Sequence, residues 1–298
     1  MDNLIVVAGA TGNLGMKICR ELIRKGGKVK ALVRKGTSQD KLNELQNLGA
    51  DVVQADMSDH QELTIACAGA SCVVSALAGL RDVIVEVQSN LLDAAVNAGV
   101  PRFIPSDFCT DFTKIPEGEN RNFDLRKEFQ IYLDKSAIQA TSIFNGAFAE
   151  ILRYNTPVFD TKNKTIAVYS GKADWNIDFT TMDDTAAFTA AAALDETSPR
   201  LLNISSFSVS PNDLVKLSSE YSSEAFELKD MGSLEAFSNY NTAERAANPE
   251  GEHELYPRWQ QAQYIYSMFY AHHSHLDNDR YEGLSWSSAR ELIKTIIR

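Results

Sequence analysis

The hydrophobic and polar positions at the start of the chain follow two periods in turn. Residues 4–9 (LIVVAG) form a short apolar run that ends at a glycine, as is typical of a buried parallel strand. Apolar residues then recur at helical spacing over 14–23, and two glycines at 26 and 27 end that helix. Residues 28–34 (KVKALVR) alternate between polar and apolar and predict a second strand.

The same pattern continues to about residue 145. We predict further strands at 50–56, 71–77, 102–108 and 141–145, and helices at 41–49, 59–69, 80–98 and 121–136. Strands that alternate with helices through short links indicate a parallel sheet with right-handed crossovers. The fold class predicted is therefore α/β, with a Rossmann-like doubly wound parallel sheet.

Beyond residue 147 the pattern loosens. Strands are predicted at 165–171 and 201–210, and helices at 182–194 and 211–222, whereas 229–283 is aromatic and has weak periodicity. We therefore place a domain boundary near 147. Residues 1–147 would form a nucleotide-binding domain, and residues 148–298 a smaller mixed α/β lobe.

Composition narrows the class of protein. The chain has 298 residues, 29 Lys+Arg against 40 Asp+Glu and a net charge of −11. An acidic chain without a basic stripe argues against nucleic-acid binding, and solubility alone would explain the charge. The four cysteines lack metal-ligand spacing, and the N-terminus has no basic segment before its first strand. We expect a cytoplasmic protein with reduced thiols, bound to no membrane and no nucleic acid.

The most informative motif is GATGNLG at 9–15, between the first strand and the first helix. Gly9 would allow the tight turn, Gly12 would let phosphates approach the main chain, and Gly15 would let helix and strand pack closely. Free amides at the helix start favour a dinucleotide pyrophosphate over a plain tight turn. The predicted binding set here is Gly9, Thr11, Gly12, Asn13, Leu14 and Gly15.

The end of the second strand should contact the ribose. An acid there would favour NAD, but the chain has Arg34 and Lys35. Two cations can bind a 2′-phosphate, so NADP(H) is preferred over NAD(H), although these residues could instead form a solvated turn. Further predicted cofactor contacts lie at the ends of the next two strands: Asp56, Met57, Ala76 and Leu77.

With these residues in view, the chain resembles the NmrA-like and isoflavone reductase-like group of atypical short-chain dehydrogenases. The matching motifs are GATGNLG (9–15), ALVR (31–34), ADVVQADMSD (50–59), QSNLLDAAVNAGVPRFIPSDF (88–108) and IFNGAF (143–148). The resemblance implies that a segment near 178–195 returns to the cofactor domain and that 148–298 is otherwise a substrate lobe. It also implies either a reductase of aromatic substrates or a regulator that only senses the dinucleotide.

The usual Tyr-x-x-x-Lys pair of short-chain dehydrogenases is absent, because Tyr132 is followed at that spacing by Ser136 and Tyr169 by Ala173. The resemblance implies instead a single lysine on the helix at 121–136. Lys127 is the candidate, as a ligand of the nicotinamide ribose and a general acid. Counting back from AIQATSIFN reaches Arg126, however, and arginine is a poor proton donor. Both alternatives stay open at this point.

The remaining candidates surround the predicted nicotinamide site. Ser106 lies near the end of the predicted fifth strand, and Asn145 is the last residue of the sixth; either could instead only shape a turn. Phe108, Phe144 and Phe148 are tentative substrate contacts. Residues 271–277 (AHHSHLD) match no metal-ligand spacing, so no metal is predicted. The aromatic stretch 256–273 could pack a core or line a flat substrate cavity.

These features favour an NADPH-dependent reductase of a small aromatic carbonyl, quinone or enone. The alternative is a regulator that binds NADP(H) without turnover. A sugar-nucleotide epimerase or dehydratase ranks last, since it would usually need the missing tyrosine–lysine pair. We expect a small-molecule substrate and a monomer or homodimer.

Overall fold

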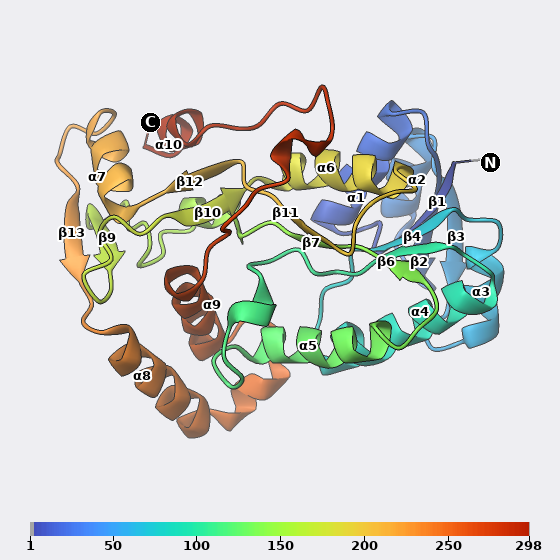
Figure 1. The fold of residues 1–298 in the computed structure, drawn as a ribbon, viewed down its shortest axis with the longest axis horizontal. Helices are drawn as coiled ribbons and strands as arrows, with labels where there is room; N and C mark the ends of the chain where they lie inside the picture. Colours follow the sequence, from blue (N-terminus) through green and yellow to red (C-terminus); the bar gives the residue numbers. More distant parts are fainter. Residues whose placement is uncertain (1–2, 298) are drawn as a thin grey trace.

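A six-stranded parallel sheet forms the centre of the first half of the molecule (Figure 1). The structure, a computed structural model, describes residues 3–297. The strands run in the order β3-β2-β1-β4-β5-β6, the doubly wound order of dinucleotide-binding folds. The predicted fold class is confirmed. The strands are β1 (Leu4–Ala8), β2 (Lys28–Arg34), β3 (Asp51–Ala55), β4 (Cys72–Ser75), β5 (Arg102–Ile104) and β6 (Gln139–Ala140).

Helices cover both faces of this sheet. One face packs against α1 (Asn13–Arg24), α2 (Gln39–Asn47) and α6 (Met182–Leu194). The other packs against α3 (His60–Cys67), α4 (Gln88–Asn97) and α5 (Arg121–Leu133). Helix α6 comes from the second half of the chain and packs along α1. Two hydrophobic cores result, and the apolar residues of β1 and β4 contribute to both.

Local sequence explains where several of these helices begin. The side chains of Asp59, Asn120 and Thr181 accept hydrogen bonds from first-turn amides of α3, α5 and α6. Such caps satisfy amides that would otherwise lack acceptors. Helix α1 differs, because its N-cap is Gly12, which has no side chain to offer.

Three predicted elements need correction. The helix expected at 80–98 is a π-helical segment, η1 (Asp82–Val87), followed by α4. The strand expected at 102–108 ends at Ile104, because the chain turns there and the Asp107 amide donates to the Pro105 carbonyl at 2.8 Å. The strand expected at 201–210 is two strands, β11 (Leu201–Asn203) and β12 (Phe207–Val209).

The second half of the chain builds a smaller lobe from short sheets. Strand β10 (Ile177–Thr180) pairs with β8 (Ala147–Phe148) and β12, while β9 (Thr165–Val168) pairs with β13 (Glu227–Asp230). Strand β7 (Ser142–Phe144) pairs with β11. The helices are α7 (Pro211–Ser219), α8 (Leu234–Ala247), α9 (Arg258–Tyr270) and α10 (Ala289–Ile297), with 3-10 turns η2 (Phe112–Lys114), η3 (Ala149–Arg153), η4 (Pro249–His253) and η5 (Asn278–Arg280).

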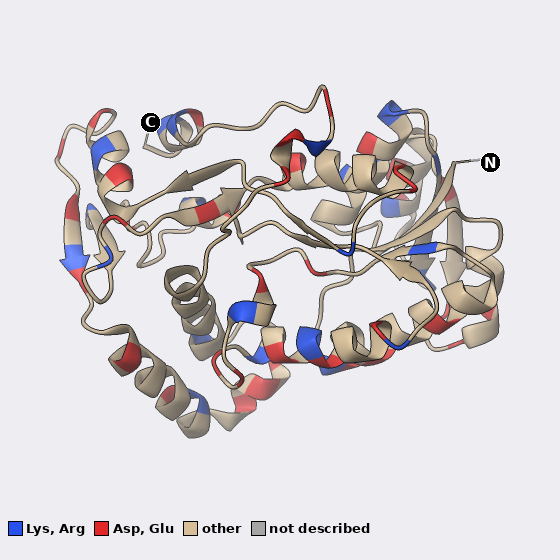
Figure 2. Cartoon of the chain, in the orientation of Figure 1, with Lys and Arg blue, Asp and Glu red and all other residues tan. Residues whose placement is uncertain are grey.

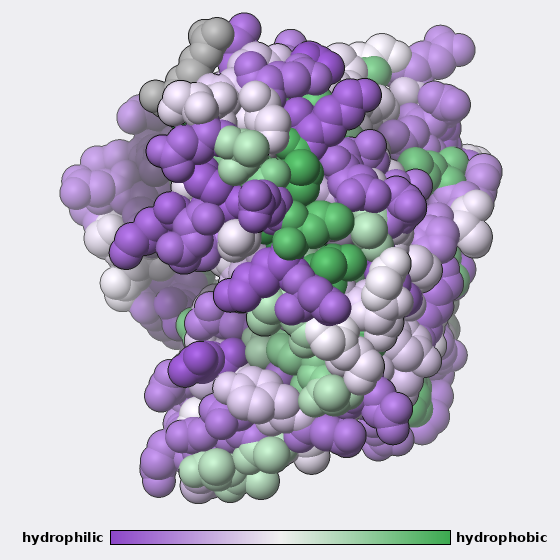
Figure 3. Space-filling model, turned by 90° about the vertical axis from the view of Figure 1, so that its left-hand side faces the viewer, coloured by the Kyte–Doolittle hydropathy of each residue, from purple (hydrophilic) through white to green (hydrophobic). Residues whose placement is uncertain are grey.

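The surface is charged and mixed. Figure 2 shows Lys and Arg interspersed with Asp and Glu over both lobes. Figure 3 views the end that carries β13 and α7, where hydrophilic side chains surround a narrow hydrophobic stripe. On β13 and just after it, Leu228 and Met231 are 36% and 38% exposed. Within residues 3–297, every helix is too short or too polar to cross a membrane.

Candidate functional site

The turn between β1 and α1 leaves no room for side chains at two of its glycines. Gly9 has φ +77°, and a Cβ there would lie 2.5 Å from the Ala76 carbonyl oxygen. A Cβ on Gly15 would lie 2.2 Å from the Gly9 carbonyl oxygen. These contacts are far below van der Waals distance, so both positions require glycine. The turn therefore brings the end of β4 and the start of α1 against β1.

The same turn exposes polar main-chain groups. Within residues 3–297, the amides of Asn13, Leu14 and Gly15 have no acceptor. The first turn of α1 contains no acidic residue, and Gly12 at its N-cap is exposed. Free amides, the positive end of the helix dipole and a missing side chain together suit an anion. A dinucleotide pyrophosphate fits this position.

The two cations after β2 differ in their surroundings. Lys35 Nζ bonds to Glu62 Oε1 at 2.5 Å, and the hydrogen bond with Glu62 raises the Lys35 pKa. The other oxygen of Glu62 accepts from the Asp56 amide at 2.8 Å, which ties the ends of β2 and β3 together. The Arg34 side chain is exposed and makes no ion pair or side-chain hydrogen bond with residues 3–297. Arg34 is thus available to a ligand, whereas Lys35 is engaged.

The ends of β4 and β5 meet beside the glycine turn. Ser106 Oγ donates to the Leu77 carbonyl at 2.7 Å, and its amide donates to Gln88 Oε1 at 2.9 Å. The Gln88 side chain also donates to the Ile84 carbonyl in η1 at 3.1 Å. Ser106 therefore holds two strand ends at a fixed separation. Gln88 was missed by sequence reasoning, because nothing in its spacing marks it.

The predicted catalytic lysine is bound to residues of α5 and of the loop before it. Lys127 Nζ donates to the Ile115 carbonyl at 2.7 Å and pairs with Asp124 at 3.3 Å, and its side chain is 24% exposed. Both partners lie on α5 or on the loop before it. The Lys127 ammonium group therefore links the loop that contains Ile115 to α5.

The neighbouring Arg126 extends toward the interior. Its Nε is buried and has no hydrogen-bond partner within residues 3–297. The guanidinium interacts electrostatically with Asp107 and Cys109, which follow β5, and with Tyr264 of α9. Burial raises the pKa of the Asp107 carboxyl, although Ser142 and Arg126 work against this. A permanent cation thus lies where the two lobes meet, beyond the carboxyl end of β5.

The remaining predicted residues divide into two groups. Phe108 and Phe148 belong to the same large hydrophobic cluster as Leu14 and Ala76, on the face of the sheet that α1 and α6 cover. Phe144 is completely buried in a separate cluster, edge-on to Phe112 with ring centroids 5.2 Å apart.

Asn145 is also completely buried. Its Nδ2 donates to Thr185 of α6 at 3.1 Å, and its Oδ1 is buried without a hydrogen-bond partner within residues 3–297. The Asn145 side chain therefore links the loop after β7 to α6.

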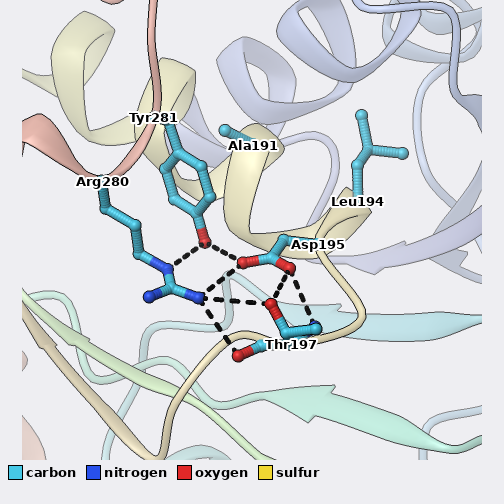
Figure 4. Close-up of a pocket in the computed structure, with 6 residues that line it drawn as sticks. All are labelled: Ala191, Leu194, Asp195, Thr197, Arg280 and Tyr281. Carbon is cyan, nitrogen blue, oxygen red and sulfur yellow. Dashed lines mark hydrogen bonds and ion pairs between the residues drawn. The ribbon is translucent and has the colours of Figure 1, made fainter.

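A pocket of about 480 Å³ lies elsewhere, at the C-terminal end of α6 (Figure 4). Its polar groups already satisfy one another: Asp195 accepts from Arg280 at 2.9 Å and from Tyr281 at 3.0 Å. The carboxyl ends of the sheet strands lie at the other end of α6. We therefore do not assign the dinucleotide to this pocket.

Comparison with known proteins agrees with this geometry. The model of the NmrA-like family matches residues 1–292. The chain belongs to the NmrA-like family. Among curated relatives, Pinoresinol reductase 2 of Arabidopsis thaliana is 32% identical over 215 residues, 67% of this chain and 66% of that protein. The family prediction made from the motifs is confirmed.

Solved structures show the same fold. AtPrR2 with NADP+ and (+)pinoresinol aligns with a TM-score of 0.81 and 23% identity, over 100% of this chain and 99% of that one. An isoflavone reductase aligns with a TM-score of 0.78 and 18% identity, over 99% of each chain. At these identities the likeness establishes the fold of this member of the NmrA-like family.

Proposed function

We propose that this protein is an NADPH-dependent reductase of a small aromatic carbonyl, quinone or enone. The observation that carries the proposal is the glycine turn, with three first-turn amides that lack acceptors at the edge of a Rossmann sheet. The relatives add support, since a curated relative is named a pinoresinol reductase and the AtPrR2 structure contains NADP+. Bound NADPH would supply a hydride.

The chain's residues fit NADP(H) better than NAD(H). The amides of residues 13–15 would bind the pyrophosphate, and Arg34 would bind the 2′-phosphate through its planar guanidinium. Lys35 would add less, because Glu62 already neutralises it. Asp56 and Met57 would lie near the adenine.

At the other end of the cofactor, the nicotinamide would approach the ends of β4 and β5. Ala76, Leu77 and Ser106 form that edge, and Ser106 fixes it through its bond to Leu77. Phe108 and Phe148 stay proposed as substrate contacts. The complete burial of Phe144 and Asn145 favours a supporting role for both.

For the proposed catalytic position on α5 we favour Arg126 over Lys127. Lys127 is held by Ile115 and Asp124, whereas Arg126 has a buried Nε without a partner and faces the residues after β5. Arginine keeps its proton at physiological pH, so Arg126 would stabilise negative charge on a substrate oxygen. It would not deliver a proton.

That property also favours a second candidate function. A chain with arginine at this position could bind NADP(H) without turnover and act as a redox sensor. The two functions differ in whether bound NADPH is consumed.

One experiment separates them. Calorimetry should show NADPH binding at least about tenfold more tightly than NADH. Loss of the NADPH absorbance band is then followed with quinones, aromatic aldehydes and enones. Consumption supports the reductase, and tight binding without consumption across the panel supports the sensor. Arg126→Met should abolish consumption while binding persists. If Lys127→Met abolishes it instead, the preference for Arg126 is wrong.

The proposed setting is the cytoplasm, with a small-molecule partner and a monomeric or homodimeric chain. All four cysteines (Cys19, Cys67, Cys72 and Cys109) are buried free thiols. This agrees with a reducing compartment.

A further inference from the structure

If this protein is a reductase, it needs a source of protons that its α5 helix does not provide. Hydride transfer to a carbonyl or enone leaves negative charge on the substrate oxygen. Arg126 can stabilise that charge but cannot neutralise it by giving up a proton. Lys127 is engaged with Ile115 and Asp124. The inference below rests on the proposed reductase function.

The hydroxyl group of Tyr264, on α9, accepts one hydrogen bond and donates none to the part of the chain that the structure describes. Its oxygen accepts a hydrogen bond from Asn122 Nδ2 at 2.8 Å. No acceptor for its proton is present within residues 3–297. The ring packs edge-on against Phe123, with centroids 5.5 Å apart, which fixes its position. A hydroxyl with a bound oxygen and an unused proton is ready to donate to a ligand.

The groups around this phenol favour its ionised form after donation. Asn122 belongs to the first turn of α5, and Arg126 follows one turn later on the same helix. Burial raises the Tyr264 pKa. The charge of Arg126 and the hydrogen bond from Asn122 lower it, but by less, so the pKa stays above its ordinary value. The phenol therefore stays protonated at neutral pH, while the phenolate that forms after donation has two stabilising neighbours.

We propose that Tyr264 is the catalytic proton donor and Arg126 its cationic partner. The pair that is missing from the sequence as Tyr-x-x-x-Lys would thus be assembled in space from α9 and the start of α5, which contact each other. The O–H bond of Tyr264 breaks and an O–H bond forms on the substrate. Water then returns a proton to the phenolate.

Two other groups could donate instead. His273 lies in the segment after α9, and both of its ring nitrogens are buried without hydrogen-bond partners within residues 3–297. Its amide donates to Asp178 Oδ2 of β10 at 2.7 Å, and no hydrogen bond joins His273 to Tyr264 or Arg126 within residues 3–297. Cys109 lies near Arg126, but its thiol already donates to the Asp107 carbonyl at 3.6 Å. We favour Tyr264 because it alone combines a fixed oxygen, a free proton and an adjacent cation.

The test uses Tyr264→Phe, which keeps the ring and removes the hydroxyl. With a substrate that the wild type reduces, kcat should fall by roughly 10² to 10⁴, and calorimetry should show unchanged NADPH binding. The solvent deuterium isotope effect on kcat should change, since water must then supply the proton directly. Tyr270→Phe, on the exposed end of the same helix, is the matched control and should behave as wild type.

A second readout needs no turnover. Tyrosine labelled at Cζ reports the Tyr264 pKa by NMR, in the protein alone and with NADP+. Arg126→Met should raise that pKa by about one unit or more, whereas Arg126→Lys should leave it lower than in the methionine variant. The other groups that act on Tyr264, Tyr256 and Cys109, are unchanged in both variants.

The outcomes separate the two levels of the proposal. If the wild type consumes no NADPH with any substrate, the proposed function fails. If the wild type is active and Tyr264→Phe retains its kcat and isotope effect, the assignment of Tyr264 is wrong. The same conclusion follows if His273→Gln loses activity while Tyr264→Phe does not. If the Tyr264 pKa is the same in Arg126→Met as in the wild type, Arg126 is not the cationic partner of Tyr264.

Discussion

Two regions of this protein carry its proposed chemistry, and they are built in opposite ways. The dinucleotide turn lies within residues 9–15, and its contacts are local or reach one neighbouring strand end. The junction of α5 and α9 joins Asn122 to Tyr264, which are 142 residues apart. The first region depends on backbone shape and the second on side chains that only the fold brings together. A local turn can be recognised in a sequence, whereas a long-range pair cannot.

The largest effect should come from Gly15→Ala in the local turn. The added Cβ would lie 2.2 Å from the Gly9 carbonyl oxygen, so β1 and α1 must separate. We expect a loss of about 3 kcal/mol in the free energy of unfolding, with dinucleotide binding lost.

Urea titration measures this loss, and Gly69→Ala is the control. Gly69 has φ +76°, unlike Gly15, but no atom lies within 4 Å of its added Cβ. That variant should lose only about 1 kcal/mol from backbone strain. Equal unfolding midpoints for the two variants would contradict the packing argument.

The alkylation rates of two cysteines, one in each region, allow a direct comparison of how closed the regions are. Cys19 lies in α1 behind the turn, and Cys109 lies beside Arg126; burial raises both pKa values to about 12. Because the thiolate is the reactive form, alkylation of either at pH 8 should be at least about a hundredfold slower than in the unfolded chain.

Mass spectrometry of timed alkylation samples gives both rates. Rapid labelling of Cys109 alone in the folded protein would show that the α5–α9 junction opens while the turn stays closed. The two regions would then also differ in stability, which the static structure does not suggest.

A smaller effect should separate Arg34 from Lys35. Arg34→Ala should weaken NADPH binding by about tenfold or more and leave NADH binding nearly unchanged, because the guanidinium has no other partner within residues 3–297. Lys35→Ala should change NADPH binding less, since Glu62 already binds that ammonium. Calorimetry with both coenzymes tests this. Equal losses from both substitutions would mean that Glu62 releases Lys35 when the ligand binds.

Much of the fold could be predicted from the sequence, because strands and helices alternate regularly through the first half of the chain. Strand β2 and helix α6 were predicted at their observed bounds, and β1 nearly so, since each has a clear period and a clear stop. Strand β10 was missed although residues 177–180 (IDFT) alternate between apolar and polar, because the run is only four residues long and both polar side chains are buried. Helix α9 was obscured for a related reason: it is buried on most sides, so its polar face is narrow.

In the candidate site too, the residues with local contacts could be predicted and those with long-range contacts could not. The glycines and Arg34 could be identified from spacing, because their neighbours in sequence are their neighbours in space. The choice between Lys127 and Arg126 could not, since adjacent helix residues point about 100° apart and the sequence does not say which direction is inward. Tyr264 stood in an aromatic stretch with no mark to single it out. Only its contact with Asn122, seen in the structure, distinguishes it from the other aromatic residues of that stretch.

The smallest effect that we predict concerns another long-range contact, where Asp195 binds Arg280 and Tyr281. Burial opposes ionisation of Asp195, but hydrogen bonds from Thr197, Arg280 and Tyr281 outweigh it and lower the carboxyl pKa. A lowered carboxyl pKa stabilises the fold above the unfolded pKa of about 3.9, and this stability is lost as the pH falls below that value.

Asp195→Asn should therefore cost about 1 kcal/mol at pH 7, and the difference from wild type should shrink below about pH 4. Thermal unfolding of both proteins across that range measures the difference. Asp51→Asn, at an exposed carboxylate of β3, is the control variant measured under the same conditions. If Asp195→Asn costs the same at pH 3 as at pH 7, the contact contributes by shape and not by charge. The Asp195–Arg280 contact would then stabilise the fold through packing. It would no longer support, by analogy, an electrostatic effect of Arg126 on Tyr264.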